Sequence, residues 1–129
     1  MQTGVDTGFF FLLEEQNSTA VDVWKNGNII TSAVVVYELQ KKLLQGRLKE
    51  LAVTLIEDIR RSVNIISLNA EISLFAAHLA HETHMPGLDA LILSSLLDAG
   101  CRQIYTTDQH FELYKKEGIE IINLKTGQN

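Results

Sequence analysis

The chain has 129 residues, of which 46% are hydrophobic and 21% charged, a composition typical of one compact soluble domain. Its formal net charge of −5 argues against a protein that coats nucleic acid without specificity. Apolar runs stay far below the roughly 20 residues of a membrane-spanning helix, and the first residues lack the positive charge of a signal peptide. The single Cys101 cannot form an intrachain disulfide, which favours a buried thiol and a cytoplasmic location.

Hydrophobic spacing divides the chain into short β-branched runs and longer helical patterns. In chain order we expect a strand over Gly4–Asp6, helices over Phe9–Glu15 and Thr19–Lys25, a strand over Asn28–Thr31, helices over Ala33–Leu44 and Leu48–Arg61, a strand over Val63–Ile66, helices over Asn69–Glu82 and Leu88–Ala99, a strand over Cys101–Tyr105, a helix over Phe111–Glu117 and a strand over Glu120–Ile122. Alternation of this kind predicts an α/β domain whose parallel sheet is covered by helices on both faces.

Four carboxylates fall where such a sheet gathers its functional groups, at the carboxyl ends of the strands. Asp6 ends the first strand, and Glu38 lies in the second turn of the helix after the second strand. Asp89 opens the helix that leads into the fourth strand, and Asp108 follows that strand. We therefore expect these four side chains to converge on one edge of the sheet.

Close carboxylates repel one another, so such a cluster needs cations to stay ionised. Oxygen ligands favour Mg²⁺ or Mn²⁺, and we expect Asp6, Asp89 and Asp108 to hold the metal. The matching chemistry is hydrolysis of a phosphodiester bond. Thr7 and Thr106 are candidates to support the site by hydrogen bonding to a ligand carboxylate or to the attacking water.

Each acid also has a purely structural interpretation. Asp89 and Asp108 suit helix N-caps, and Asp6 suits an ordinary turn at the end of a strand. Asp89, however, shares a helix face with Ile92, Leu93 and Leu96, where an unpaired carboxylate is costly to bury. The convergence of four such positions favours a shared site over separate structural roles.

The ordered set of motifs resembles the PIN domain family, and most closely the compact VapC-type toxins of toxin–antitoxin pairs. The matching segments are Val5-Asp6-Thr7-Gly8-Phe9-Phe10, residues Ser32 to Glu38, Leu88-Asp89-Ala90-Leu91-Ile92-Leu93 and Thr106-Thr107-Asp108-Gln109-His110-Phe111. No segment is diagnostic alone, but their order and spacing span nearly the whole chain.

The resemblance implies a single PIN domain over residues 1–129, with a Rossmann-like sheet of strand order 3-2-1-4-5 flanked by helices. It also implies a metal-dependent endoribonuclease with the conserved acids of the family at Asp6, Glu38, Asp89 and Asp108, an RNA substrate, a homodimer and a VapB-type antitoxin partner. Many relatives carry another acid two residues after the Asp108 position, where this chain has His110. That difference leaves open whether one or two metal ions bind.

Three other signals carry less weight. His78, His81 and His84 have a spacing that a zinc site could use, but a solvated helix end explains them as well, and the motif departs from the zincin pattern by one position. Phe9, Phe10 and Phe11 are interpreted as core and interface packing rather than a base-stacking surface. Basic residues gather in the middle of the chain, which we interpret as solvated helix faces; they are Lys41, Lys42, Arg47, Lys49, Arg60 and Arg61.

The sequence disfavours two rival functions. A PIN-like scaffold that binds RNA or protein without catalysis would be expected to lack one of the acids, and all four are present. A signalling receiver domain would need an aspartate after the third strand, where Val63-Asn64-Ile65-Ile66-Ser67-Leu68 offers none.

Overall fold

The computed structural model of the protein describes residues 2–46 and 52–125. Its elements are β1 (Thr3–Val5), α1 (Thr7–Glu14), α2 (Ser18–Asn26), β2 (Ile29–Ser32), α3 (Ala33–Leu44), α4 (Ala52–Ser62), β3 (Asn64–Ile66), α5 (Ala70–Thr83), α6 (Gly87–Asp98), β4 (Gln103–Thr106), the 3-10 helix η1 (Gln109–Leu113) and β5 (Glu120–Asn123). The first residues of the helix expected over Leu48–Arg61, residues 48–51, lie outside the described part.

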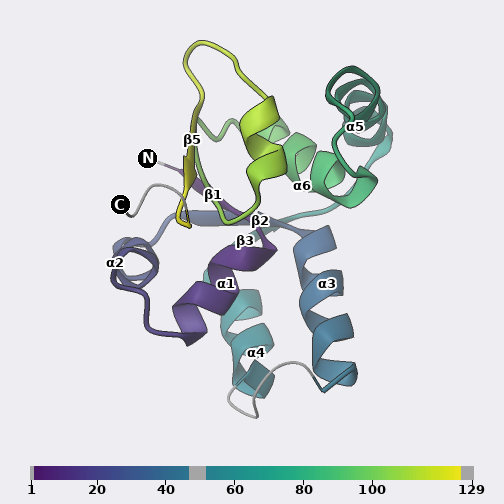
Figure 1. The fold of residues 1–129 in the computed structure, drawn as a ribbon. Coiled ribbons are helices and arrows are strands. Elements are labelled where there is room, and N and C mark those ends of the chain that lie inside the picture. Colours follow the sequence, from purple (N-terminus) through teal and green to yellow (C-terminus); the bar gives the residue numbers. More distant parts are fainter. Residues whose placement is uncertain (1, 47–51, 126–129) are drawn as a thin grey trace.

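The five strands form one parallel sheet of order β3-β2-β1-β4-β5, which confirms the predicted topology. Helices α5 and α6 cover one face of this sheet, and α1, α3 and α4 lie on the other (Figure 1). Strand β1 is the central strand of this order, and its Val5 has no exposed surface.

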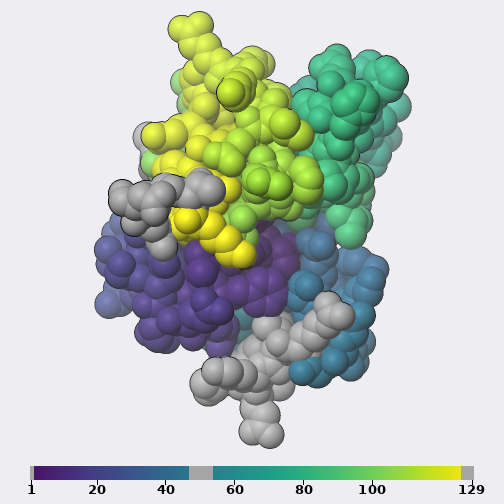
Figure 2. All heavy atoms as spheres, in the orientation of Figure 1, coloured from purple at the N-terminus to yellow at the C-terminus, as the bar shows by residue number. Residues whose placement is uncertain are grey.

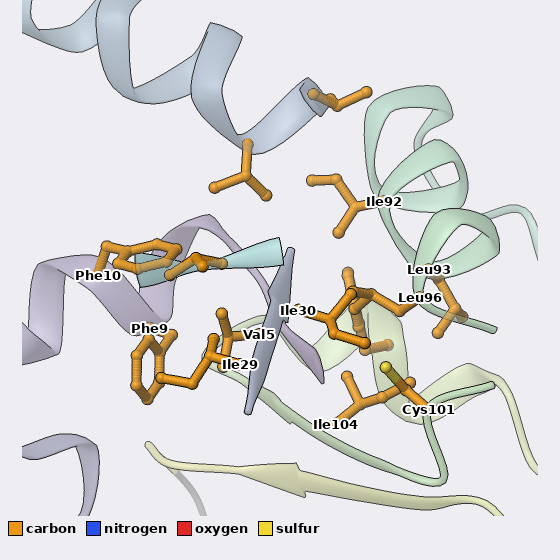
Figure 3. Close-up of a cluster of buried hydrophobic side chains, with 14 of the residues drawn as sticks. Val5, Phe9, Phe10, Ile29, Ile30, Ile92, Leu93, Leu96, Cys101 and Ile104 are labelled. Atoms are coloured by element: carbon orange, nitrogen blue, oxygen red, sulfur yellow. The ribbon is translucent and has the colours of Figure 1, made fainter. Parts of the chain in front are cut away.

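The core has two halves, one on each side of the sheet. Side chains alternate along a strand, so the neighbouring Ile29 and Ile30 of β2 point to opposite faces (Figure 3). Ile29 lies on the side of Phe9 and Phe10, and Ile30 on the side of Leu96. Phe9 and Phe10 are fully buried and pack edge to face at 5.4 Å, which confirms their interpretation as core residues.

One predicted element was wrong in type and extent. The segment expected as a helix over Phe111–Glu117 forms only the short 3-10 helix η1, which ends when Tyr114 adopts extended backbone angles. Phe111 is the one buried residue of η1, while Leu113 is half exposed. The segment therefore has no continuous apolar face to stabilise a longer α-helix by packing.

Within the described residues, none of the helices has both the length and the apolar character that a membrane crossing requires.

Candidate metal centre

The carboxyl edge of the sheet brings the four predicted acids together from four elements. Asp6 follows β1 and caps α1, Glu38 lies in the second turn of α3, Asp89 lies in the first turn of α6, and Asp108 follows β4 and caps η1. Figure 2 shows that α1 (purple), α3 (blue) and the η1 segment (yellow-green) meet at a hollow on this face of the molecule.

Asp6 is held rigidly at the base of the centre. Its Oδ1 accepts a 3.0 Å hydrogen bond from the Phe9 amide, and its Oδ2 accepts bonds of 2.5 Å from the Thr106 hydroxyl and 3.4 Å from the Thr107 amide. Burial raises the pKa of Asp6 to about 6; the hydrogen bonds oppose this increase and the negative charge of Asp108 adds to it. A cation nearby would favour the ionised form.

Asp89, Asp108 and His110 form a compact group at the mouth of the centre. Nδ1 of His110 lies 2.8 Å from Oδ1 of Asp108 and 3.6 Å from Oδ2 of Asp89. Burial raises the pKa of Asp89 to about 7, and a hydrogen bond with Asp108 and the negative charges of Asp108 and Glu38 act in the same direction. The carboxylates are thus close enough to destabilise one another's ionised forms.

Glu38 joins the centre from α3. The Thr7 hydroxyl donates a 2.5 Å hydrogen bond to Glu38 Oε1, which orients that carboxylate across the start of α1. Its negative charge adds to the increase in the pKa of Asp89, after burial and the effects of Asp108. The acids are therefore linked in a chain of electrostatic contacts that runs from Asp6 through Asp108 and Asp89 to Glu38.

Of the two acids suggested as helix caps, Asp108 caps η1 and Asp89 caps no helix, while Asp6, suggested as an ordinary turn residue, caps α1. Asp6 and Asp108 each accept a hydrogen bond from a backbone amide of the helix that they precede. Helix α6 instead begins after Pro86 without a side-chain cap, so Asp89 makes no capping bond. A structural role alone leaves the position of Asp89 unexplained, since its carboxylate faces Asp108 and His110.

The donor set fits a divalent cation. Among the described residues, Asp89, Asp108 and His110 are the three that can place one ligand atom each within 4.8 Å of one another. Nδ1 of His110 has no solvent exposure and no hydrogen bond of good geometry, although it faces two carboxylates. Carboxylate oxygens suit Mg²⁺ and Mn²⁺, and an imidazole nitrogen suits Mn²⁺. Asp6, expected as a ligand, lies beside this group with both oxygens hydrogen-bonded.

Sequence reasoning missed the part played by Gly8. A Cβ atom on Gly8 would come within 1.7 Å of Thr107 Oγ1 and 2.9 Å of Thr107 Cβ, so only glycine lets α1 approach the β4–η1 connection this closely. That connection carries Thr106 and Asp108. The adjacency of Gly8 to an acid at a strand end was the only sequence signal, and it is a weak one.

The histidine series on α5 shows no sign of a metal site. Helix α5 ends at Thr83, and His84 caps it with a left-handed backbone at φ 60°. His78, His81 and His84 are all exposed, and among the described residues it is Asp89, Asp108 and His110, not these histidines, that bring ligand atoms together. This agrees with their interpretation as a solvated helix end.

Comparisons with known proteins agree with the fold. The model of the PIN domain family matches residues 5–117. VapBC2 from Rickettsia felis, solved bound to a promoter DNA fragment, has a chain that superposes with a TM-score of 0.74 at 18% identity, covering 94% of this chain and 97% of that one. A chain of VapBC-1 from nontypeable Haemophilus influenzae superposes with a TM-score of 0.69 at 16% identity, covering 95% of this chain and 98% of that one.

A toxin–antitoxin complex from Klebsiella pneumoniae contains a chain with a TM-score of 0.69 and 16% identity, covering 92% of this chain and 95% of that one. A comparison with curated protein sequences gave no significant match. At such low identities the solved structures establish the fold, while the family model covers most of the sequence. The parallel sheet, the acids at its carboxyl edge and the match over residues 5–117 together show that the chain belongs to the PIN domain family.

Proposed function

We propose that this protein is a Mg²⁺- or Mn²⁺-dependent endoribonuclease that hydrolyses RNA phosphodiester bonds, and that it acts in the cytoplasm as the VapC-type toxin of a toxin–antitoxin pair. The observation that carries the proposal is the group formed by Asp89, Asp108 and His110, with Asp6 and Glu38 beside it. In this proposal residues 1–129 form a single PIN domain.

Asp89 and Asp108 are the proposed metal ligands, with His110 as a third donor and Asp6 facing them from the floor of the site. A divalent cation bound there makes water a better nucleophile at neutral pH and stabilises the charge that develops on the phosphate. Thr106 holds the Asp6 carboxylate in position through its hydroxyl. Because Asp6 is nearly buried, its charge is not screened by bulk water and acts strongly on the reacting groups.

Glu38, which α3 brings to the centre, is the proposed acceptor of a proton from the attacking water. Its second oxygen, Oε2, is left for that role, because the Thr7 hydroxyl bonds Oε1. This bond also fixes the direction of the carboxylate, which a general base needs.

The solved structures that resemble this chain include VapBC complexes, and this supports an antitoxin of the VapB type as partner. A homodimer is also part of the proposal. The fully buried Phe9 and Phe10 are not available for it, whereas Leu74 and Phe75 on α5 are 67% and 42% exposed. Such side chains are costly to leave in water and suit an interface with a second copy.

The test is cleavage of a pool of single-stranded and structured RNAs with Mg²⁺, with Mn²⁺ and with a chelator. The matched control is Asp89→Asn, purified in the same way, because it removes one proposed ligand and keeps the volume of the side chain. Metal-dependent cutting by the wild type, reduced at least about 100-fold in Asp89→Asn, is the expected result.

Equal cutting by the two proteins would overturn the assignment. An absence of cutting, together with no Mn²⁺ binding by calorimetry, would instead identify a non-catalytic PIN scaffold. Tight Mn²⁺ binding without cutting of the pool would require substrates outside that pool to be tested before the nuclease is rejected.

A further inference from the structure

A cleft of about 160 Å³ lies between α3 and the start of α6, directly beside the acidic centre. The residues that line it are Tyr37, Glu38, Lys41, Lys42, Gln45 and Leu88. In Figure 2 the blue surface of α3 meets the green surface of the α5–α6 segment on the right-hand side of the molecule. Glu38 belongs both to the cleft and to the acidic centre, and Leu88 precedes Asp89, so the two sites are continuous.

Two large side chains that line the cleft, Tyr37 and Leu88, are exposed and are not part of the buried core. Tyr37 is 53% exposed and Leu88 is 42% exposed, which leaves an aromatic ring and an apolar side chain in water. Nζ of Lys41 lies 6.0 Å from the centre of the Tyr37 ring, at the distance of a cation–π contact. An exposed aromatic ring beside lysines is the combination with which proteins bind a single nucleic-acid strand.

The distribution of charge around the cleft also favours a nucleic-acid strand as the ligand. The chain carries a net charge of −5 and its centre gathers four carboxylates, so a polyanion that reaches the centre needs positive charge close by. Lys41 and Lys42 supply it from the α3 wall of the cleft. From Glu38 to Gln45 the helix extends about 10 Å, at 1.5 Å per residue, so the basic part of the wall leads away from the carboxylates.

We propose that Tyr37, Lys41 and Lys42 form a subsite for single-stranded RNA, in which one base stacks on the Tyr37 ring and the neighbouring phosphates contact the two lysines. This inference rests on the proposed ribonuclease function and assigns the side from which the substrate enters the centre. It replaces the interpretation of Lys41 and Lys42 as an ordinary solvated helix face. Arg47 and Lys49, the next basic residues along the chain, lie outside the described residues.

The first experiment measures cleavage of a short single-stranded RNA by the full chain in Mn²⁺, for Tyr37→Ala, Tyr37→Phe and the wild type. Loss of one stacked base is expected to raise KM roughly 5- to 100-fold in Tyr37→Ala. Tyr37→Phe keeps the ring and should stay within about 2-fold of wild type. We expect kcat to change little in either variant, because Tyr37 does not touch the reacting atoms.

The second experiment measures RNA affinity directly, by binding of a fluorescently labelled copy of the same short RNA. All proteins in it carry Asp89→Asn to prevent cleavage. Lys41→Ala and Lys42→Ala should each lower the slope of log affinity against log salt concentration by about 0.7. The matched control is Lys25→Ala, since Lys25 is an exposed lysine of α2 outside the cleft, and its salt slope should not change. A merely structural role of the lysines would leave the slope unchanged.

The outcomes separate this inference from the function on which it rests. Cleavage by the wild type, with KM and salt slope unchanged in the cleft variants, would overturn the subsite, keep the nuclease and leave a protein partner as the occupant of the cleft. Absence of cleavage by the wild type, together with absence of Mn²⁺ binding, would overturn the nuclease, and the binding experiment would still show whether RNA occupies the cleft. Equal thermal stability of Tyr37→Ala and wild type is expected and excludes misfolding as the cause of a raised KM.

Discussion

The Thr106 hydroxyl donates a 2.5 Å hydrogen bond to Oδ2 of Asp6, although the two residues are 100 positions apart in the chain. Their strands are neighbours, since β1 pairs with β4 in the centre of the sheet. The same hydroxyl accepts a 2.9 Å bond from the Asp108 amide. One side chain therefore ties the acid after β1 to the backbone that positions the acid after β4.

We predict that Thr106→Val reduces RNA cleavage about 10- to 100-fold, the usual effect of losing a group that orients a metal-site ligand. Loss of the hydroxyl removes a hydrogen bond that lowers the pKa of Asp6, so this pKa should rise further above about 6. The activity profile should accordingly move to higher pH. Thr106→Ser keeps the hydroxyl and is the control; a similar loss in both variants would show that the methyl group matters and the hydrogen bond does not.

The metal-free protein should lose stability as the pH rises from about 4 to about 7. In the folded state the pKa of Asp6 is about 6 and that of Asp89 about 7, against an ordinary value of 3.8 for both. In this window the folded state holds more protons than the unfolded state, so deprotonation favours unfolding. Thermal melts in a chelator measure the effect, and Mn²⁺ should reverse it at pH 7 by stabilising the ionised carboxylates.

The double variant Asp6→Asn/Asp89→Asn provides the reference for these melts, since its other ionisable groups are those of the wild type. Asn at position 6 keeps an acceptor for the Phe9 amide and so preserves the cap of α1. We expect its stability to fall less between pH 4 and 7. Identical pH dependence in the two proteins would contradict the raised pKa values.

His110 should influence which metal binds. His110→Ala is expected to weaken Mn²⁺ binding about 10-fold or more, because it removes the donor nearest to Asp89 and Asp108. His110→Asp replaces nitrogen with oxygen and should shift the preference toward Mg²⁺. Calorimetric titration of each variant with each metal checks this. Unchanged affinities in both variants would place His110 outside the ligand set.

Gly8→Ala should destabilise the protein by about 1–3 kcal/mol, the usual cost of overpacking, because the new methyl group collides with Thr107. Displacing that connection also shifts Thr106 and Asp108, so we expect cleavage to fall by about 100-fold. Urea unfolding and single-turnover cleavage measure the two effects.

Gly87→Ala is the matched control, since Gly87 begins α6 and a Cβ atom there meets nothing within 4 Å. It should leave stability unchanged or raise it by up to about 1 kcal/mol. If both glycine variants behave alike, the close approach of Gly8 to Thr107 has no energetic importance.

The strand order of the sheet followed from the resemblance to the PIN domain family, whereas the sequence by itself predicted the five strands and the positions of the acids along the chain. These depend on local features: apolar spacing selects strand or helix, and an acid directly after a parallel strand lies at the carboxyl edge. The helix predicted over Ala33–Leu44 has the observed bounds of α3, since Ser32 caps its first turn through a bond to the Val34 amide. Where local signals were weak, as in Phe111–Glu117, the predicted helix was wrong.

Only the tertiary structure decided which atoms of these residues meet. It placed Nδ1 of His110 between Asp89 and Asp108, set Gly8 against Thr107, and put Leu88 across a cleft from Tyr37. His110 and Asp108 are only two residues apart, but the other contacts join different elements of the fold and depend on how deeply and at what angle those elements pack. Periodicity fixes the face on which a residue lies within its own helix or strand, but the partner on the facing element is set by packing of the whole core.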